Sequence, residues 1–264
     1  MQQAIDFYEE SEALFRLIDP LEEQAFDQKT QFKEWSINDV LGHLHMWNWA
    51  ADLTLKDSEA FEAFLNKLVE ALMSGTPLRQ FEYDWRGGVN GRELLKQWHE
   101  FYSEMARRFE ATDPKLRVKW FGPDMSVRSK MTARLMETWA HGQEVYDLLG
   151  VERENRDRIK NIAQLGVNTF GWTYKNRKME VPDTIPYLRL TGPSGDIWEW
   201  NDPSDEEKVE GLAAEFCQVV TQVRHVEDTS LTMVGETAKQ WMSIAQCFAG
   251  PPVDPPKPGT RYKQ

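Results

Sequence analysis

Glu137 and His141 are the residues of this chain whose types and spacing point most clearly to chemistry. In an α-helix, side chains four positions apart lie on one face, one turn apart, so a single helix can supply two ligands to one metal ion. His43 is a candidate third ligand from a second helix, because it is surrounded by apolar residues and follows Gly42, which allows a neighbour to approach closely. The alternative for His43 is a hydrogen-bonded histidine of the core.

These three residues together offer two nitrogens and one carboxylate oxygen. Three protein ligands leave the fourth position of a tetrahedral zinc ion open for water or substrate, which is typical of catalytic rather than structural zinc sites. The sequence therefore predicts a metal site formed by His43, Glu137 and His141. His45 points to another side of the helix from His43, so the two cannot bind one ion from a regular helical backbone. His99 is either an additional ligand or base, or a half-exposed helical residue.

Two arginines, Arg86 and Arg224, are candidate catalytic residues that contact a substrate carboxylate. A guanidinium binds a carboxylate through two parallel hydrogen bonds, which is the reason for choosing arginine. The alternative for each is a surface ion pair. The two cysteines, Cys217 and Cys247, lie within apolar helical patterns and are expected to be small core residues of a reduced compartment.

Helices must position these side chains. Ser36 and Asp39 have the spacing of a helix N-terminal capping pair, directly before the segment that carries His43, and Gly150 follows the helix that carries Glu137. Four main helices in the first 150 residues favour a four-helix bundle with crossover connections. Apolar periodicity predicts helices over residues 3–26, 36–54, 57–73, 91–110, 126–149 and 157–174.

The pattern changes near residue 180. Two alternating segments, 187–190 and 197–200, flank a Gly-Pro-Ser-Gly turn and predict a β-hairpin. Ser204 and Glu207 have the spacing of a capping box and predict a helix to about residue 223. A strand at 230–234 and a helix at 236–248 follow. We therefore predict an α+β chain with a helical bundle over 1–178, a smaller α+β domain over 179–250 and a Pro-rich tail over 251–264.

The composition excludes several partners. The chain has 264 residues and a net charge of −12, and no cluster of Lys and Arg suits nucleic acid or an anionic membrane. The N-terminal segment lacks a targeting pattern, and the apolar runs are shorter than the roughly 20 residues that span a bilayer. We expect a cytoplasmic protein, a monomer or a homodimer, with a small-molecule substrate.

Several segments carry a family resemblance. The first runs from Trp35 to Leu44, and far downstream come Glu137-x-x-x-His141 and the segment Asp147 to Gly150. Together they resemble the N-terminal domain of the mycothiol-dependent maleylpyruvate isomerase family, within the DinB-like metal-binding four-helix bundles. Residues 190–196 and 209–214 resemble the C-terminal domain of that family, which has a sterol-carrier-like α+β fold. The resemblance covers most of the chain and is closest to an uncharacterised branch.

The resemblance implies roles for the candidate residues. The metal triad of the family, one histidine of the second helix and Glu-x-x-x-His of the fourth, falls on His43, Glu137 and His141. It implies a divalent metal, Zn²⁺ as the expected ion, and a low-molecular-weight thiol such as mycothiol as cosubstrate. The expected activity is metal-dependent addition of that thiol to a small electrophile, as an isomerase or S-transferase. The alternatives are a non-enzymatic metal- and apolar-ligand-binding protein and a metal-dependent hydrolase.

Overall fold

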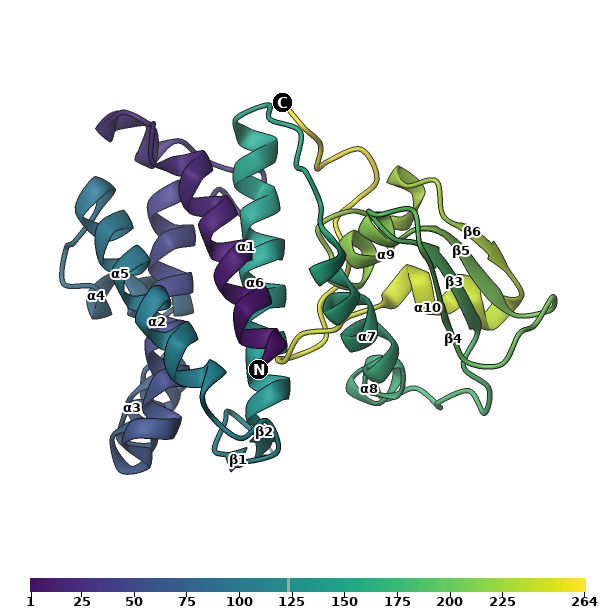
Figure 1. The fold of residues 1–264 in the computed structure, drawn as a ribbon, viewed down its shortest axis with the longest axis horizontal. Helices are drawn as coiled ribbons and strands as arrows, with labels where there is room; N and C mark the ends of the chain where they lie inside the picture. The colour runs from purple at the N-terminus through teal and green to yellow at the C-terminus, as the bar shows by residue number, and fades with distance from the viewer. Residues whose placement is uncertain (123) are drawn as a thin grey trace. The chain divides into compact units, whose positions relative to one another are not determined.

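The chain forms two compact units in the computed structural model, which describes residues 1–122 and 124–264. The first unit is Met1–Val145 and the second is Tyr146–Gln264 (Figure 1). The division falls near the end of a long helix, whereas the sequence placed the domain limit at 178/179. The difference arises because the helical segment after residue 157 packs against the helices of the second unit.

The first unit consists almost entirely of helices. Its central helix α2 packs against α3, α4 and α5, and α1 packs along α5. The elements are α1 (Gln2–Ile18), the 3-10 helix η1 (Glu23–Asp27), α2 (Ile37–Lys56), α3 (Ser58–Met73), α4 (Leu78–Trp85), α5 (Gly91–Glu110), the strands β1 (Arg117–Val118) and β2 (Met125–Ser126), and α6 (Val127–Leu148).

Local sequence signals explain where these helices begin and end. Ser36 and Asp39 form the predicted capping box at the start of α2, with the Asp39 amide 3.1 Å from Ser36 Oγ and the Ser36 amide 2.9 Å from Asp39 Oδ2. Gly150 adopts the predicted left-handed conformation after α6, with φ at 65°. The first helix ends at Ile18 and not at residue 26, because Pro20 cannot continue a helix.

The second unit packs helices against a four-stranded mixed sheet in the order β4-β3-β5-β6. The predicted hairpin is confirmed by antiparallel pairing of β3 with β4, and β3 pairs with β5 in parallel. The elements are η2 (Asp157–Ile159), α7 (Lys160–Asn168), α8 (Phe170–Asn176), β3 (Tyr187–Thr191), β4 (Ile197–Trp200), β5 (Lys208–Leu212), α9 (Ala213–Val220), η3 (Val226–Asp228), β6 (Thr232–Val234) and α10 (Glu236–Ile244).

The prediction of a helix from Ser204 to about residue 223 was wrong over its first half, which forms a turn and strand β5. Ser204 Oγ accepts the Glu207 amide at 3.1 Å, but this closes a turn that leads into strand β5. The Glu207 carboxylate instead accepts the amides of Thr237 and Ala238, at the start of α10. Because serine caps turns as well as helices, the same pattern fits both structures. The helix starts only at Ala213, and the sheet gains a strand.

The α+β class is confirmed, and both cysteines are buried as predicted, Cys217 within α9 and Cys247 beyond the end of α10 at Ile244. The Pro-rich tail, residues 251–264, is held by hydrogen bonds. Gln222 Nε2 donates to the Val253 carbonyl at 2.8 Å, and the Gly259 amide donates to Asp228 at 2.8 Å. Among the described residues, no helix is both long and apolar enough to cross a membrane.

Candidate metal centre

The structure brings His43 of α2 together with Glu137 and His141 of α6. One ligand atom from each lies within 4.8 Å of the others. Glu137 Oε2 is 3.3 Å from His43 Nε2 and 3.4 Å from His141 Nε2, so the carboxylate lies between the two imidazoles. The Glu137 side chain is 24% exposed and that of His141 is 14% exposed, which leaves the cluster open to solvent on one side.

The ionisation of the three side chains reflects their mutual contacts. Burial alone would lower the pKa of His43, but the charges and hydrogen bonds of Glu82 and Glu137 outweigh it and raise this pKa to about 9. Burial would raise the pKa of Glu137, yet hydrogen bonds from His141 and His43 hold it well below its ordinary value. Burial, together with the neighbouring charge of His43, lowers the pKa of His141. The site thus holds Glu137 as a carboxylate.

Glu82 of α4 is a member of this cluster that sequence reasoning missed. Its Oε1 is 2.7 Å from Nδ1 of His43 and accepts a hydrogen bond from Trp47 Nε1 at 3.1 Å. The Glu82 side chain is only 5% exposed. His43 therefore has one nitrogen against Glu82 and the other against Glu137. No periodic spacing links residues 43 and 82, so the sequence carries no signal for this contact.

Aromatic rings cover part of the cluster. Trp35 stacks on His141, with ring centroids 5.4 Å apart and planes 5° apart, and it also contacts His43 at 5.3 Å. Phe32 meets His141 edge-on at 5.2 Å. Trp35 and Phe32 precede α2, so the segment that leads into this helix forms an apolar wall beside the two histidines. Such a wall excludes water and strengthens electrostatic interactions within the site.

A buried arginine lies one turn before Glu137 on α6. Arg134 is 3% exposed, and its Nε donates to Asn48 Oδ1 at 2.9 Å. Burial lowers the pKa of Arg134 to about 10, an effect that the negative charges of Glu137 and Glu82 partly offset. The guanidinium therefore adds one positive charge that interacts favourably with these two carboxylates.

Comparison with known proteins identifies the family. The family described as mycothiol maleylpyruvate isomerase N-terminal domain matches residues 7–146, which include all three clustered residues. The chain belongs to this family. Two proteins of Mycobacterium tuberculosis, from strains CDC 1551 and H37Rv and both described as uncharacterised, are each 35% identical to it over 94% of this chain and 95% of theirs.

Solved structures of the mycothiol-dependent maleylpyruvate isomerase share the fold. One superposes with a TM-score of 0.55 at 14% identity and covers 88% of this chain and 91% of its own. A point mutant of that isomerase superposes with a TM-score of 0.51 and covers 83% of this chain and 87% of its own. At this identity the likeness establishes the fold alone.

Within this isomerase-family fold, the other two candidate histidines lie apart from the cluster. The His45 ring meets Trp85 and Phe101 edge-on, and burial lowers the pKa of His45 to about 4. His99 Nε2 lies 3.1 Å from Glu12 Oε1, which also accepts a hydrogen bond from Tyr102. Both histidines thus contact residues outside the cluster, as the sequence predicted for His45.

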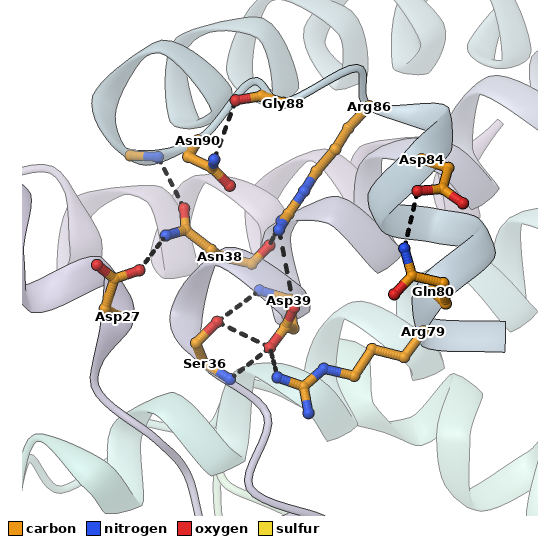
Figure 2. Close-up of polar contacts among 11 residues, drawn as sticks. Asp27, Ser36, Asn38, Asp39, Arg79, Gln80, Asp84, Arg86, Gly88 and Asn90 are labelled. Carbon is orange, nitrogen blue, oxygen red and sulfur yellow. Dashed lines mark hydrogen bonds and ion pairs between the residues drawn. The ribbon is translucent and has the colours of Figure 1, made fainter. Parts of the chain in front are cut away.

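Arg86, a predicted catalytic residue, is buried beside the start of α2. Figure 2 shows its side chain reaching across to Asn38 and Asp39, with Nη1 donating to the Asn38 carbonyl at 2.7 Å. Gly42 lies beneath it, and a Cβ there would come 3.1 Å from Nη1. Arg86 lines a groove of about 930 Å³ between η1, the start of α2 and α4. The residues that line this groove do not include the three clustered ligands.

Arg224, the second predicted catalytic residue, belongs to the second unit. Its Nη2 lies 2.7 Å from both carboxylate oxygens of Asp147, and Nη1 donates to its neighbour's carbonyl at 3.1 Å. The side chain is 11% exposed and that of Asp147 is 4% exposed. The guanidinium is thus engaged in a largely buried ion pair, and its predicted contact with a substrate carboxylate would have to share or replace this partner.

Proposed function

We propose that this chain is a metal-dependent enzyme that activates a low-molecular-weight thiol, such as mycothiol, for addition to a small electrophile, as an isomerase or S-transferase. The observation that carries the proposal is the clustering of His43, Glu137 and His141 within 4.8 Å of one another. Membership of the mycothiol maleylpyruvate isomerase family supports the choice of thiol.

The donor set fits a divalent metal, and zinc in particular. Imidazole nitrogens and a carboxylate oxygen are ordinary zinc ligands, and three of them leave one position open. A zinc ion held by His43, Glu137 and His141 would lower the pKa of a thiol in that position and so make a thiolate at neutral pH. The wall of Trp35 and Phe32 would keep bulk water away from one side of that thiolate.

The reaction class follows from thiolate chemistry. The sulfur forms a bond to one carbon of an electron-poor double bond, whose π electrons move to the conjugated carbonyl. The former double bond can then rotate, and loss of the sulfur restores the alkene as its isomer. In a transferase, a proton is added instead and the adduct is the product. Arg86 and Arg224 are proposed to bind a carboxylate of the substrate.

The chain's own cysteines support a thiol supplied by a cosubstrate. Both are buried in the second unit. Burial raises the pKa of the Cys217 thiol, which keeps it protonated and unreactive. Cys247 is 4% exposed. We therefore assign the nucleophilic sulfur to a small molecule. A cytoplasmic location and a monomeric or homodimeric state belong to the same proposal.

The test is an assay of zinc-loaded protein with mycothiol, glutathione or cysteine and a cis-configured, carbonyl-conjugated alkene such as maleylpyruvate. We expect isomer or adduct formation that needs both the thiol and the metal, and that His141→Ala abolishes. His45→Leu is the matched control and should retain activity. Absence of turnover with every thiol would contradict the proposal, and turnover of esters or amides without thiol would identify a hydrolase.

A further inference from the structure

The two ring nitrogens of His43 face different carboxylates, those of Glu82 and Glu137. The Glu82 carboxylate lies 2.7 Å from Nδ1, whereas Nε2 faces Glu137 at 3.3 Å. A neutral imidazole carries its proton on only one nitrogen, and a carboxylate accepts but does not donate. Both nitrogens thus face carboxylates, and each can donate to one of them while the ring is protonated. If an ion takes the place of the proton on Nε2, the contact with Glu82 keeps the remaining proton on Nδ1 and leaves the Nε2 lone pair to the ion.

Helix α4 holds Glu82 in place. Phe81 and Trp85, on either side of Glu82 in the sequence, pack against the apolar cluster of α2 and α3 that contains Met46 and Phe64. The indole of Trp47 donates to the same Glu82 oxygen at 3.1 Å, which fixes that oxygen from a second direction. The carboxylate is thus oriented by packing and by hydrogen bonding, as a group that orients a metal ligand must be.

The charge of the buried cluster also requires a second carboxylate. Glu137 supplies one negative charge, and the buried guanidinium of Arg134 offsets it. A divalent cation would then add positive charge to a site with no net negative charge, which is unfavourable where most of the surrounding side chains are buried. Glu82, 4% exposed, provides the second negative charge next to His43.

We propose that Glu82 is the positioning residue of the metal centre: it holds His43 with Nδ1 as hydrogen-bond donor, directs Nε2 toward the ion, and supplies a second buried negative charge. This inference rests on the proposed metal centre and assigns a role to a residue of a third helix. Carboxylate partners of metal-bound histidines typically contribute 10- to 100-fold to metal affinity.

The experiment measures zinc affinity by chelator competition for the wild-type chain, Glu82→Gln and Glu82→Ala. Glutamine retains an acceptor for Nδ1 and loses the charge, so we expect roughly tenfold weaker binding; alanine loses both, so we expect about 100-fold. The matched control is Asp84→Ala, since Asp84 is an exposed acidic residue of the same helix. Its affinity should equal that of the wild type.

A second readout separates positioning from stability. Nitrogen chemical shifts of the His43 ring in the zinc-loaded wild type should show a protonated Nδ1 and zinc on Nε2, and Glu82→Ala should lose this fixed arrangement. A purely structural residue would lower the midpoint of thermal unfolding and leave the zinc affinity of the folded protein unchanged.

The outcomes distinguish the two proposals. Zinc affinity of Glu82→Ala within twofold of the wild type, or metallation of His43 through Nδ1, would overturn the role of Glu82 and leave the metal centre standing. Failure of the wild type itself to bind zinc more tightly than His141→Ala would overturn the metal centre, and the role of Glu82 with it.

Discussion

The interiors of the two units use buried polar side chains differently. In the first unit, ionisable groups from three helices are buried beside one another: His43, Glu82 and Arg134 are each less than a tenth exposed. In the second unit, two buried amides bond to the main chain. Gln222 donates to two carbonyls, and Gln246 both donates to a carbonyl and accepts an amide of the segment after residue 250.

Buried amides and buried ionisable groups call for different explanations. A buried amide bonded to the main chain fixes the course of the backbone and needs no other explanation. Buried ionisable groups cost stability unless they are paired, and a hydrophobic replacement is often as stable. The gathering of charged groups around His43 therefore calls for a functional account, which metal binding supplies, whereas the two buried amides of the second unit are explained by their bonds to the main chain.

The largest expected effect is a loss of stability on changing the apolar core of the second unit. Trp241 is fully buried, and its ring meets Phe170 at 5.2 Å and Phe216 at 5.6 Å. Trp241→Ala should lower the free energy of unfolding by about 3–5 kcal/mol. Denaturant titration measures this loss, and the zinc affinity of the folded protein should not change. Weaker zinc binding by the folded Trp241→Ala variant would contradict the assignment of metal binding to the first unit.

The next effect compares two histidines of one helix. His43→Ala should weaken zinc binding by more than the roughly 100-fold typical of a partner residue, because it removes a direct ligand. His45 has an aromatic environment and a pKa lowered to about 4, so His45→Leu should bind zinc as the wild type does. Chelator competition measures both. Equal loss in the two variants would contradict the assignment of His43.

A smaller effect concerns a buried lysine of the first unit. Lys130 Nζ donates to the Lys119 carbonyl at 2.6 Å and lies 3.9 Å over the Trp120 ring; burial, together with the charge of Arg134, lowers its pKa from 10.5 to about 7. Between these pH values the unfolded chain holds the proton and the folded chain does not, so stability rises with pH.

Lys130→Met should remove this rise. The free energy of unfolding of the wild type should increase between pH 7 and pH 10, relative to that of the variant, by up to about 1.4 kcal/mol per pH unit. Urea titrations at pH 7, 8 and 9 measure the two slopes. Identical slopes would show that Lys130 stays protonated when buried, with its ammonium stabilised by the Lys119 carbonyl and the Trp120 ring.

The smallest effect concerns Arg86. Arg86→Lys keeps the charge but loses the planar pair of donors that binds a carboxylate. If Arg86 contacts the substrate, KM for a substrate with a carboxylate should rise severalfold, while KM for its uncharged ester should not change. Steady-state kinetics with the two substrates makes the comparison. An unchanged KM for the acid would restrict Arg86 to its contact with the Asn38 carbonyl.

The sequence predicted the parts of the candidate site that lie on long, regular helices. The pair Glu137 and His141 could be predicted because helical spacing determines which side chains share a face, and His43 because apolar residues surround it and Gly42 precedes it. Glu82 could not, because α4 is only eight residues long and its contact with His43 depends on how two helices pack. Likewise, the sequence could not show that Ser204 closes a turn before β5. The pairing of β5 with β3, a contact between distant parts of the chain, determines the structure there.

The central claim is that His43, Glu137 and His141 hold a metal ion, and the metal content of the protein tests it most directly. The measurement is elemental analysis of the chain purified without an affinity tag, beside His141→Ala purified in the same way. The account predicts about one divalent metal ion per wild-type chain and its loss from the variant. A natively folded wild type without metal, or an equal metal content in the variant, would contradict it.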